Sequence, residues 1–206
     1  PENISKKIIE IVEHFQWKGV VGCGFPTPFY QGRCKVGSNL HDDWIGVHVE
    51  QLFSEATGLP FKVINDADAA GMAEMAYGAG KDKPGLVVVI TLGTGIGSGL
   101  FLDGKLIPNT EFGHLRYKNK PFEKYAADSV RVAEELSYKK WGKRLNKYFN
   151  RLELIISPDT IIIGGSPSKT LNKFRHHLKS KAEILPAENK NEAGIIGAAL
   201  AARSIM

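Results

Sequence analysis

The sequence has little cysteine, no long apolar run and no internal repeat, and each absence excludes a class of protein. Cys23 and Cys34 are the only cysteines among 206 residues, too few for a disulfide framework or for a zinc site of four thiolates. No apolar stretch approaches the ~20 residues that a membrane-spanning helix needs. We therefore expect a protein of a reducing, cytoplasmic compartment with no membrane partner.

Composition and charge are those of an ordinary globular protein. Hydrophobic residues make up 43% of the chain and charged residues 24%, which excludes a fully disordered chain. The net charge is +5, from 27 Lys and Arg against 22 Asp and Glu. This modest excess is compatible with a polyanionic partner but does not require one. The length fits one large domain or two small ones.

Apolar strands alternate with helical patterns along the chain, which predicts an α/β fold with mixed sheets. Hydrophobic periodicity and turn residues predict helices over 4–15, 47–57, 66–77, 138–156, 168–178 and 191–203, and strands over 20–24, 61–64, 86–90 and 160–163. Residues 24–43 are predicted to form a loop or hairpin, and Asp103-Gly104 a tight turn within a hairpin over 99–107. A ligand is expected at the carboxyl ends of the strands, where glycines and acidic residues cluster.

Residues 91–99 are the segment richest in glycine, and hydroxyl side chains stand between the glycines. Such a run lets successive backbone N–H groups approach an anion, which favours a phosphate-binding loop over a glycine-rich strand or bulge. Leu100 stands where the dinucleotide-binding fingerprint needs a third glycine, and Leu106 stands where the P-loop needs Ser or Thr. The segment therefore predicts a phosphate site of another kind.

Three further segments carry polar or glycine residues after a predicted strand. Asp66 stands where a strand gives way to a helix, so it is either a helix cap or a general base for a hydroxyl that attacks phosphorus. Residues 111–114 combine Glu111 and His114 with a glycine, a set that suits vicinal sugar hydroxyls, with a surface turn as the alternative. Gly164-Gly165 either caps the following helix or holds a phosphate or nucleoside at its positive end.

These segments, in their order along the chain, resemble those of the ROK sugar kinases (repressor, open reading frame, kinase). The resemblance is carried by residues 63–71, 91–99, 111–114 and 161–165, and it covers nearly the whole chain from about Gly19 onward. Residues 103–111 and 157–165 are similar to the polyphosphate glucokinase branch of the family.

The resemblance implies an actin-like, ribonuclease H-like fold of two lobes with the sugar bound between them. One lobe would comprise residues 1–68 and 191–206, and the other residues 69–190. By this match Asp66 is the base that activates the 6-hydroxyl of glucose, and the sugar would be held by Asn65, Glu111, His114 and Glu123. The phosphate donor, accompanied by Mg²⁺, would be held by Thr91, Gly93, Thr94, Gly95, Gly97, Gly164 and Gly165.

Two segments depart from the family pattern. Many ROK proteins carry a cysteine-rich zinc loop just after the Gly-His pair, but residues 115–120 contain no cysteine, so we expect no zinc and no metal held by the protein alone. The family also begins with an Asp-x-Gly-Gly phosphate loop, and nothing before Ile4 matches it. We therefore expect the small lobe to be incomplete at its N-terminus and unstable or badly formed.

The expected function is that of a glucokinase that uses polyphosphate, and ATP as well. On their own, the basic residues of helix 138–156 and of 175–181 are expected to form a solvated face. Given the resemblance, they favour polyphosphate over ATP as the donor, since a chain of phosphates needs a longer positive track than a nucleotide does. An ATP-dependent ROK hexokinase for another sugar and a catalytically inactive, sugar-binding fragment stay open as alternatives.

A sugar-sensing regulator is disfavoured, because the 18 residues before Gly19 are too few for a DNA-binding helix-turn-helix. We expect glucose and polyphosphate or ATP as partners, no nucleic acid, and a homodimer as one compatible assembly.

Overall fold

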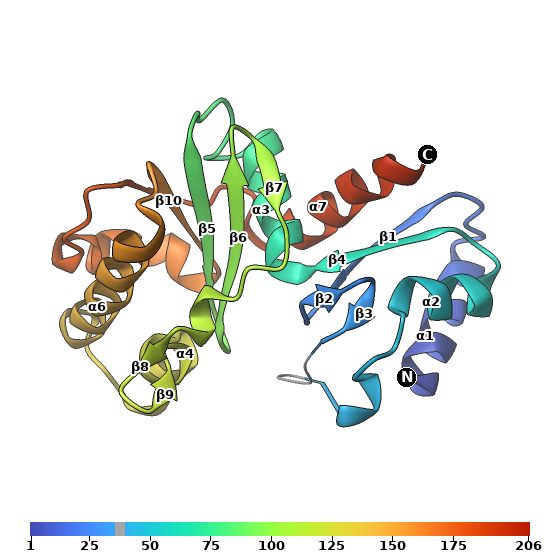
Figure 1. Ribbon diagram of the computed structural model, residues 1–206, viewed down its shortest axis with the longest axis horizontal. Helices are drawn as coiled ribbons and strands as arrows, with labels where there is room; N and C mark the ends of the chain where they lie inside the picture. The colour runs from blue at the N-terminus through green and yellow to red at the C-terminus, as the bar shows by residue number, and fades with distance from the viewer. Residues whose placement is uncertain (36–39) are drawn as a thin grey trace.

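Two groups of elements lie side by side in the computed structural model, which describes residues 1–35 and 40–206 (Figure 1). The first group comprises α1 (Glu2–His14), β1 (Val21–Phe25), β2 (Phe29–Tyr30), β3 (Arg33–Cys34), η1 (Asp42–Trp44), α2 (Val49–Thr57) and β4 (Phe61–Asn65). β1 and β4 pair in parallel, and β2 and β3 form a short antiparallel hairpin. The predicted loop or hairpin over 24–43 is found as this hairpin, and its residues 36–39 lie outside the described part of the chain.

Aromatic side chains form the core of the first group. Phe25 at the end of β1 lies against Trp44, with 4.9 Å between the ring centroids, and Phe53 of α2 contacts both rings. Phe61 of β4 completes the cluster, in which all four side chains are buried. This packing fixes the direction of β4, and the polar end of that strand is the first part of the site described below.

The second group is built on a five-stranded mixed sheet in the order β11-β10-β5-β6-β7. Its strands are β5 (Leu86–Leu92), β6 (Ile96–Leu102), β7 (Lys105–Ile107), β10 (Thr160–Gly164) and β11 (Glu183–Pro186). β11, β10 and β5 run in parallel, whereas β5, β6 and β7 are antiparallel neighbours. Apart from two helices described below, the other elements are η2 (Phe112–His114), β8 (Arg116–Tyr117), β9 (Lys120–Pro121), α4 (Glu123–Ala126), α5 (Asp128–Ala133), α6 (Tyr138–Ile156), η3 (Ser166–Lys173), η4 (Arg175–His177), η5 (Lys190–Glu192) and η6 (Arg203–Ile205).

The long helix α6 packs its apolar face against this sheet. Trp141, Leu145, Phe149 and Leu152 recur at helical spacing and are fully buried in the same core as the strand residues of β5 and β10. Ser137 caps the helix by accepting the N–H of Lys140 through its hydroxyl. The opposite face of α6 exposes its lysines, whereas Arg144 is half-buried and donates to the Tyr125 carbonyl and to Glu134.

Helices α3 (Asp66–Tyr77) and α7 (Ala193–Ala202) lie between the two groups and pack closely on each other (Figure 1). Gly197 makes this contact possible, because a Cβ built there would lie 1.6 Å from the carbonyl oxygen of Ala69. β1 packs equally closely on α7, since a Cβ at Gly22 would lie 2.0 Å from the carbonyl oxygen of Ala198. α7 is therefore held between β1 and the helix that begins at Asp66.

The predicted α/β fold with mixed sheets is confirmed, and two local predictions are wrong. Residues 168–178 are not one α-helix but two 3-10 segments, because the backbone of Thr170 leaves helical geometry and Phe174 separates η3 from η4. The short strand β11 was not predicted, since its few residues include Glu183 and Pro186. The division into lobes at residues 68 and 191 stays a prediction. Among the described residues, no helix combines the length and apolar character needed to cross a membrane.

Candidate active site

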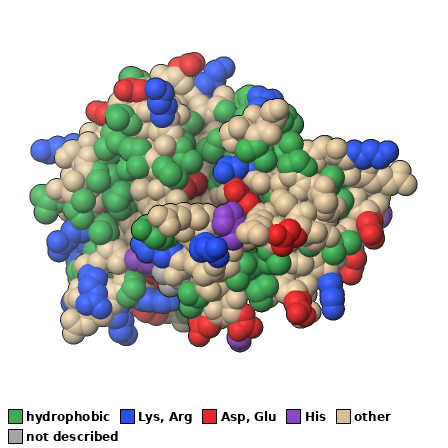
Figure 2. Space-filling view, turned by 45° about the vertical axis from the view of Figure 1, so that its right-hand side comes forward, with side chains coloured by type: hydrophobic (Ala, Val, Ile, Leu, Met, Phe, Trp, Pro, Cys, Tyr) green, Lys and Arg blue, Asp and Glu red, His purple; other side chains and the backbone are tan. Residues whose placement is uncertain are grey.

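A cavity of about 580 Å³ opens where β4, β5 and β10 end, between the two groups of elements. This is the place that the strand ends predict for a ligand. Figure 2 shows acidic and histidine side chains gathered around a hollow near the middle of one face of the molecule. Most of the predicted site residues line the cavity together, namely Asn65, Asp66, Thr91, Gly93, Thr94, Gly95, Gly97, Glu111, His114, Glu123 and Gly165.

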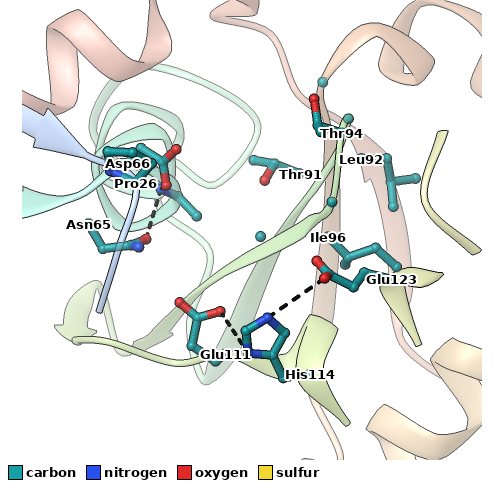
Figure 3. A pocket seen from close by; sticks show the side chains of 15 residues that line it. Pro26, Asn65, Asp66, Thr91, Leu92, Thr94, Ile96, Glu111, His114 and Glu123 are labelled. Atoms are coloured by element: carbon teal, nitrogen blue, oxygen red, sulfur yellow. Dashed lines mark hydrogen bonds and ion pairs between the residues drawn. The ribbon is translucent and has the colours of Figure 1, made fainter. Parts of the chain in front are cut away.

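Asn65 and Asp66 have different roles at the start of α3: one caps the helix and the other extends into the cavity. The side-chain oxygen of Asn65, which is buried, accepts the N–H groups of Ala67 and Asp68 at 2.9 and 3.1 Å and so caps the helix. Asp66 also accepts the N–H of Ala67, at 2.8 Å, but its side chain extends into the cavity (Figure 3). Loss of water around the Asp66 carboxyl raises its pKa above the usual range. The alternative that Asp66 serves only as a cap is therefore weakened, because Asn65 already caps the helix.

Three polar side chains line the cavity across from Asp66: Glu111 from the loop after β7, His114 from η2 and Glu123 from α4. His114 lies between two carboxylates, with Nδ1 at 3.8 Å from Glu111 Oε2 and Nε2 at 3.8 Å from Glu123 Oε1 (Figure 3). These separations are too long for direct hydrogen bonds, so each group keeps capacity for a ligand hydroxyl. Burial raises the pKa of the Glu111 carboxyl, and the charge of His114 opposes that rise.

The glycine-rich segment is the end of the β5–β6 hairpin. Leu92 pairs with Ile96, so Gly93, Thr94 and Gly95 form the connecting turn. α5 braces this turn from behind, where Ser129 donates its N–H to the Gly93 carbonyl at 3.0 Å and its hydroxyl to the Thr94 carbonyl at 2.7 Å. The turn is therefore a fixed backbone surface on the wall of the cavity that contains Asp66.

A Cβ would crowd neighbouring side chains at two glycines of this hairpin. A Cβ at Gly95 would lie 2.5 Å from Glu123 Oε2, and a Cβ at Gly97 would lie 2.5 Å from Thr91 Oγ1. Both the interpretation as a phosphate loop and that as a glycine-rich strand were open from the sequence. The structure combines them, because Gly97 lies within β6 and still lines the cavity.

The two consecutive glycines at the end of β10 lie in different surroundings. Gly165 has a φ of +79° and lines the cavity, where its backbone passes close to the carbonyl oxygen of Leu92. Gly164 is the last residue of β10, paired with Thr91, and it is buried in the sheet. Gly164 is not among the residues that line the cavity, so a direct contact with a donor is expected from Gly165 instead.

Other cavity-lining residues were not predicted from the sequence. Pro26, which follows β1, and Ile96, at the start of β6, contribute apolar wall. Pro26 could have been found, because it also follows the carboxyl end of a strand. Ile96 carried no signal, since an apolar residue within a glycine-rich run is equally expected in a core.

Comparison with known proteins agrees with this geometry. A family model described as the ROK family matches residues 1–124, which is more than half of the chain. The chain belongs to the ROK family.

A polyphosphate glucokinase of Mycobacterium tuberculosis is 42% identical to this ROK protein over 202 residues, which cover 98% of this chain and 76% of that protein. The crystal structure of an inorganic polyphosphate/ATP-glucomannokinase from Arthrobacter sp. strain KM matches with a TM-score of 0.92 at 37% identity, over 100% of this chain and 84% of that one. The expected resemblance to ROK sugar kinases, and to their polyphosphate glucokinase branch, is confirmed.

The two-lobed ROK fold is also found in a more distant structure. A ROK family glucokinase from Streptomyces griseus, in complex with glucose and AMPPNP, matches with a TM-score of 0.82 at 22% identity, over 98% of this chain and 88% of that one. At this identity the likeness concerns the fold alone. Together with the Arthrobacter structure at 37% identity, this match confirms the expected actin-like, ribonuclease H-like class for this ROK protein.

A group of cations lies on the face formed by α6 and η4. The pKa of His177 is lowered by loss of water and by the positive charges of His176, Lys139 and Lys143, so these four side chains share one field. Lys173, at the end of η3, lies nearby with its ammonium 5.2 Å from the ring centroid of Tyr138 in α6. Along the chain, η3 begins directly after Gly165 at the cavity and ends at Lys173, and η4 follows with His176 and His177; this group of basic side chains is here called the cation cluster.

Metal-ligating side chains do not form clusters in the described part of this ROK protein. Within residues 1–35 and 40–206, no three His, Cys, Asp or Glu side chains gather closely enough to hold a metal ion. The cavity does offer the carboxylate of Asp66 and the hydroxyls of Thr91 and Thr94. These oxygen atoms fit Mg²⁺, which takes few protein ligands and receives the others from phosphate and water.

Proposed function

We propose that this chain transfers the terminal phosphoryl group of polyphosphate, and also that of ATP, to the 6-hydroxyl of glucose. The observation that carries the proposal is the single cavity in which Asp66 and the turn of Gly93, Thr94 and Gly95 occur together. A base and a phosphate-sized backbone cradle are the two parts that phosphoryl transfer to an alcohol needs. The names of the relatives described above support the same reaction class.

In the proposed reaction Asp66 accepts the proton of the 6-hydroxyl as its oxygen bonds to the terminal phosphorus. The bond between that phosphorus and the bridging oxygen breaks, and the electron pair leaves with a shortened polyphosphate or with ADP. The raised pKa of Asp66 makes the carboxylate a better proton acceptor than an exposed aspartate. When bound with the donor, Mg²⁺ supplies neutralisation of the phosphate charge.

The sugar would be oriented by the polar residues opposite Asp66. Glu111, His114 and Glu123 offer acceptors and an imidazole that match adjacent hydroxyls of a pyranose ring. Asn65 lines the same cavity from the side of Asp66, although its side-chain oxygen is already used by the helix cap. We therefore assign the main sugar contacts to the Glu111–His114–Glu123 group.

The cation cluster supports polyphosphate as a donor. A phosphate chain whose end lies at the Gly93–Gly95 turn can extend along η3 toward Lys173, Lys139 and His176, where a nucleotide makes fewer contacts. Each phosphate contact releases counterions, so affinity for such a chain falls steeply with salt.

The decisive experiment measures glucose 6-phosphate formation by this chain with Mg²⁺, using polyphosphate and ATP in parallel at several salt concentrations. We expect activity with both donors and a KM for polyphosphate that rises more steeply with salt than the KM for ATP. Activity with ATP alone would favour the ATP-dependent hexokinase. Glucose binding without turnover by either donor would favour the inactive, sugar-binding alternative.

The role of Asp66 is tested by Asp66→Asn, which keeps the size of the side chain and removes the base. We expect turnover to fall at least ~100-fold while glucose binding changes little. Asp42→Asn is the matched control, because Asp42 is an exposed aspartate of η1 outside the cavity. Near-normal turnover in Asp66→Asn would remove Asp66 from this role.

A further inference from the structure

A second aspartate at the start of α3 has contacts that helix formation does not explain. Asp68 stands two residues after Asp66, and its side chain is 1% exposed. Its Oδ2 accepts the backbone N–H of Asn109 at 2.8 Å, across 41 residues of sequence. Asn109 in turn accepts the backbone N–H of Phe29 through its side-chain Oδ1, also at 2.8 Å. Two hydrogen bonds thus connect α3, the loop after β7 and the β2–β3 hairpin.

Asn109, the middle residue of this connection, lies close in sequence to the proposed sugar site. Asn109 precedes Glu111 by two residues, and β6 holds the intervening backbone, since Ser98 donates its hydroxyl to the Thr110 carbonyl at 2.7 Å and accepts the Phe112 N–H at 3.0 Å. Ser98 therefore fixes both neighbours of Glu111, and Asp68 fixes the point where the loop enters.

Asn109 itself adopts a conformation that few residues accept. Its φ of +63° lies in the left-handed region, where asparagine is one of the few side chains that occur readily. A fixed turn at this point determines where the next two residues place their side chains. The backbone of Asn109 and its side chain thus serve separate contacts, one toward Asp68 and one toward Phe29.

The burial of the Asp68 carboxyl destabilises the folded protein. Its Oδ1 is buried and has no hydrogen-bond partner among the described residues, and it adjoins a second cavity of about 530 Å³ that Asn109 and Phe29 also line. Burying an unsatisfied carboxyl oxygen destabilises a fold, so folding alone does not account for an acid here. Burial raises the pKa of Asp68 to about 7, and the N–H of Asn109 opposes that rise.

We propose that Asp68 and Asn109 are positioning residues of the sugar site. Asp68 holds the loop that carries Glu111 at a fixed distance from the helix that carries Asp66. Asn109 joins that loop to the β2–β3 hairpin, so that α3, the loop and the hairpin share one set of contacts. The inference rests on the proposed function, because it concerns how glucose is held, and it assigns no proton transfer to either residue.

The test compares two pairs of variants by steady-state kinetics and by calorimetric titration with glucose. Asp68→Ala removes the acceptor for Asn109, whereas Asp68→Asn keeps an oxygen there. Asn109→Gly tolerates the positive φ but removes the acceptor for Phe29, whereas Asn109→Asp keeps that acceptor. We expect the Ala and Gly variants to bind glucose about tenfold more weakly, with the KM for polyphosphate within about twofold of the parent. The Asn and Asp variants should stay within about threefold of the parent for both.

Thermal unfolding of each variant separates positioning from general destabilisation. A folded Asp68→Ala variant with unchanged glucose affinity would overturn the inference, as would equal losses for glucose and polyphosphate. If Asp68→Ala does not fold, the Asn109 pair decides by the same criteria. A parent protein that phosphorylates glucose while these variants match it refutes only this inference, whereas a parent that binds no glucose refutes the proposed function as well.

Discussion

The contact between α3 and α7 allows a quantitative prediction for Gly197→Ala. A Cβ at this position would lie 1.6 Å from the carbonyl oxygen of Ala69, so the two helix backbones must separate by ~2 Å to restore van der Waals contact. α7 cannot retreat freely, because Gly22 of β1 packs against its other side. We therefore expect α3 to shift and Asp66, three residues from Ala69, to move with it.

Two losses follow from this displacement. Overpacking of two helix backbones should destabilise the protein by about 3 kcal/mol, which lowers Tm by about 6–12 °C in a chain of this size. A shift of the base by an ångström or more should lower kcat about 100-fold at temperatures where the variant is still folded. The assays are thermal unfolding followed by circular dichroism, and initial rates of glucose 6-phosphate formation well below Tm.

Gly194→Ala is the matched control on the same helix. A Cβ at Gly194 meets nothing within 4 Å, so the added methyl group should be tolerated and can raise stability by up to ~1 kcal/mol through helix propensity. A Gly197→Ala variant with the Tm and kcat of the parent would refute the reasoning. A stability loss with full kcat in the folded variant would show that α3 does not carry Asp66 with it.

Three further predictions concern other parts of the molecule. Glu74 is buried in α3 and accepts four hydrogen bonds, from the backbone N–H groups of Ala79, Glu188 and Asn189 and from the Asn189 side chain. Glu74→Ala should therefore lower the free energy of unfolding, measured in urea, by at least ~3 kcal/mol, and a smaller loss would contradict this account. Tyr148 has a buried hydroxyl without a partner among the described residues, so Tyr148→Phe should leave stability unchanged or raise it by ~1 kcal/mol, and a clear drop in Tm would indicate an unseen partner. Burial raises the pKa of Asp66, and the reaction needs its carboxylate. We therefore expect kcat/KM to fall as the pH decreases through that raised pKa, at a higher pH than for an exposed aspartate. In Asp66→Asn this fall of kcat/KM at low pH should disappear.

Much of the fold could be predicted because its long elements have strong local patterns. Helix α6 begins and ends at the predicted residues, since a capping serine precedes a regular apolar face that runs from Trp141 to Leu152. The prediction of an α-helix over 168–178 was wrong because Pro167 and the tertiary contacts of Leu171 and Phe174 favour short 3-10 turns over one continuous helix. Local propensity is overridden there by how the chain packs on the sheet.

Most residues of the candidate site could be predicted from the sequence, but which of them face the cavity and which support it could not. The sequence placed Asp66 and the glycine-rich segment near strand ends, and both line one cavity. It could not show that Gly164 turns into the sheet while Gly165 faces the cavity, because that depends on the backbone after β10. The role of Asp68 was also out of reach, since its partner Asn109 is 41 residues away and no local pattern connects them.

The division of tasks between Asn65 and Asp66 has a consequence for how activity is encoded. Aspartate caps a helix about as well as asparagine, so exchanging the two residues should preserve the cap and leave the protein folded. The exchanged protein would have the same amino-acid composition, mass and net charge, yet an amide would stand where the carboxylate faces the cavity. The carboxylate of the exchanged chain would stand in the buried cap position, so we expect that chain to bind the substrate without converting it, and the order of two adjacent residues would decide between the two behaviours.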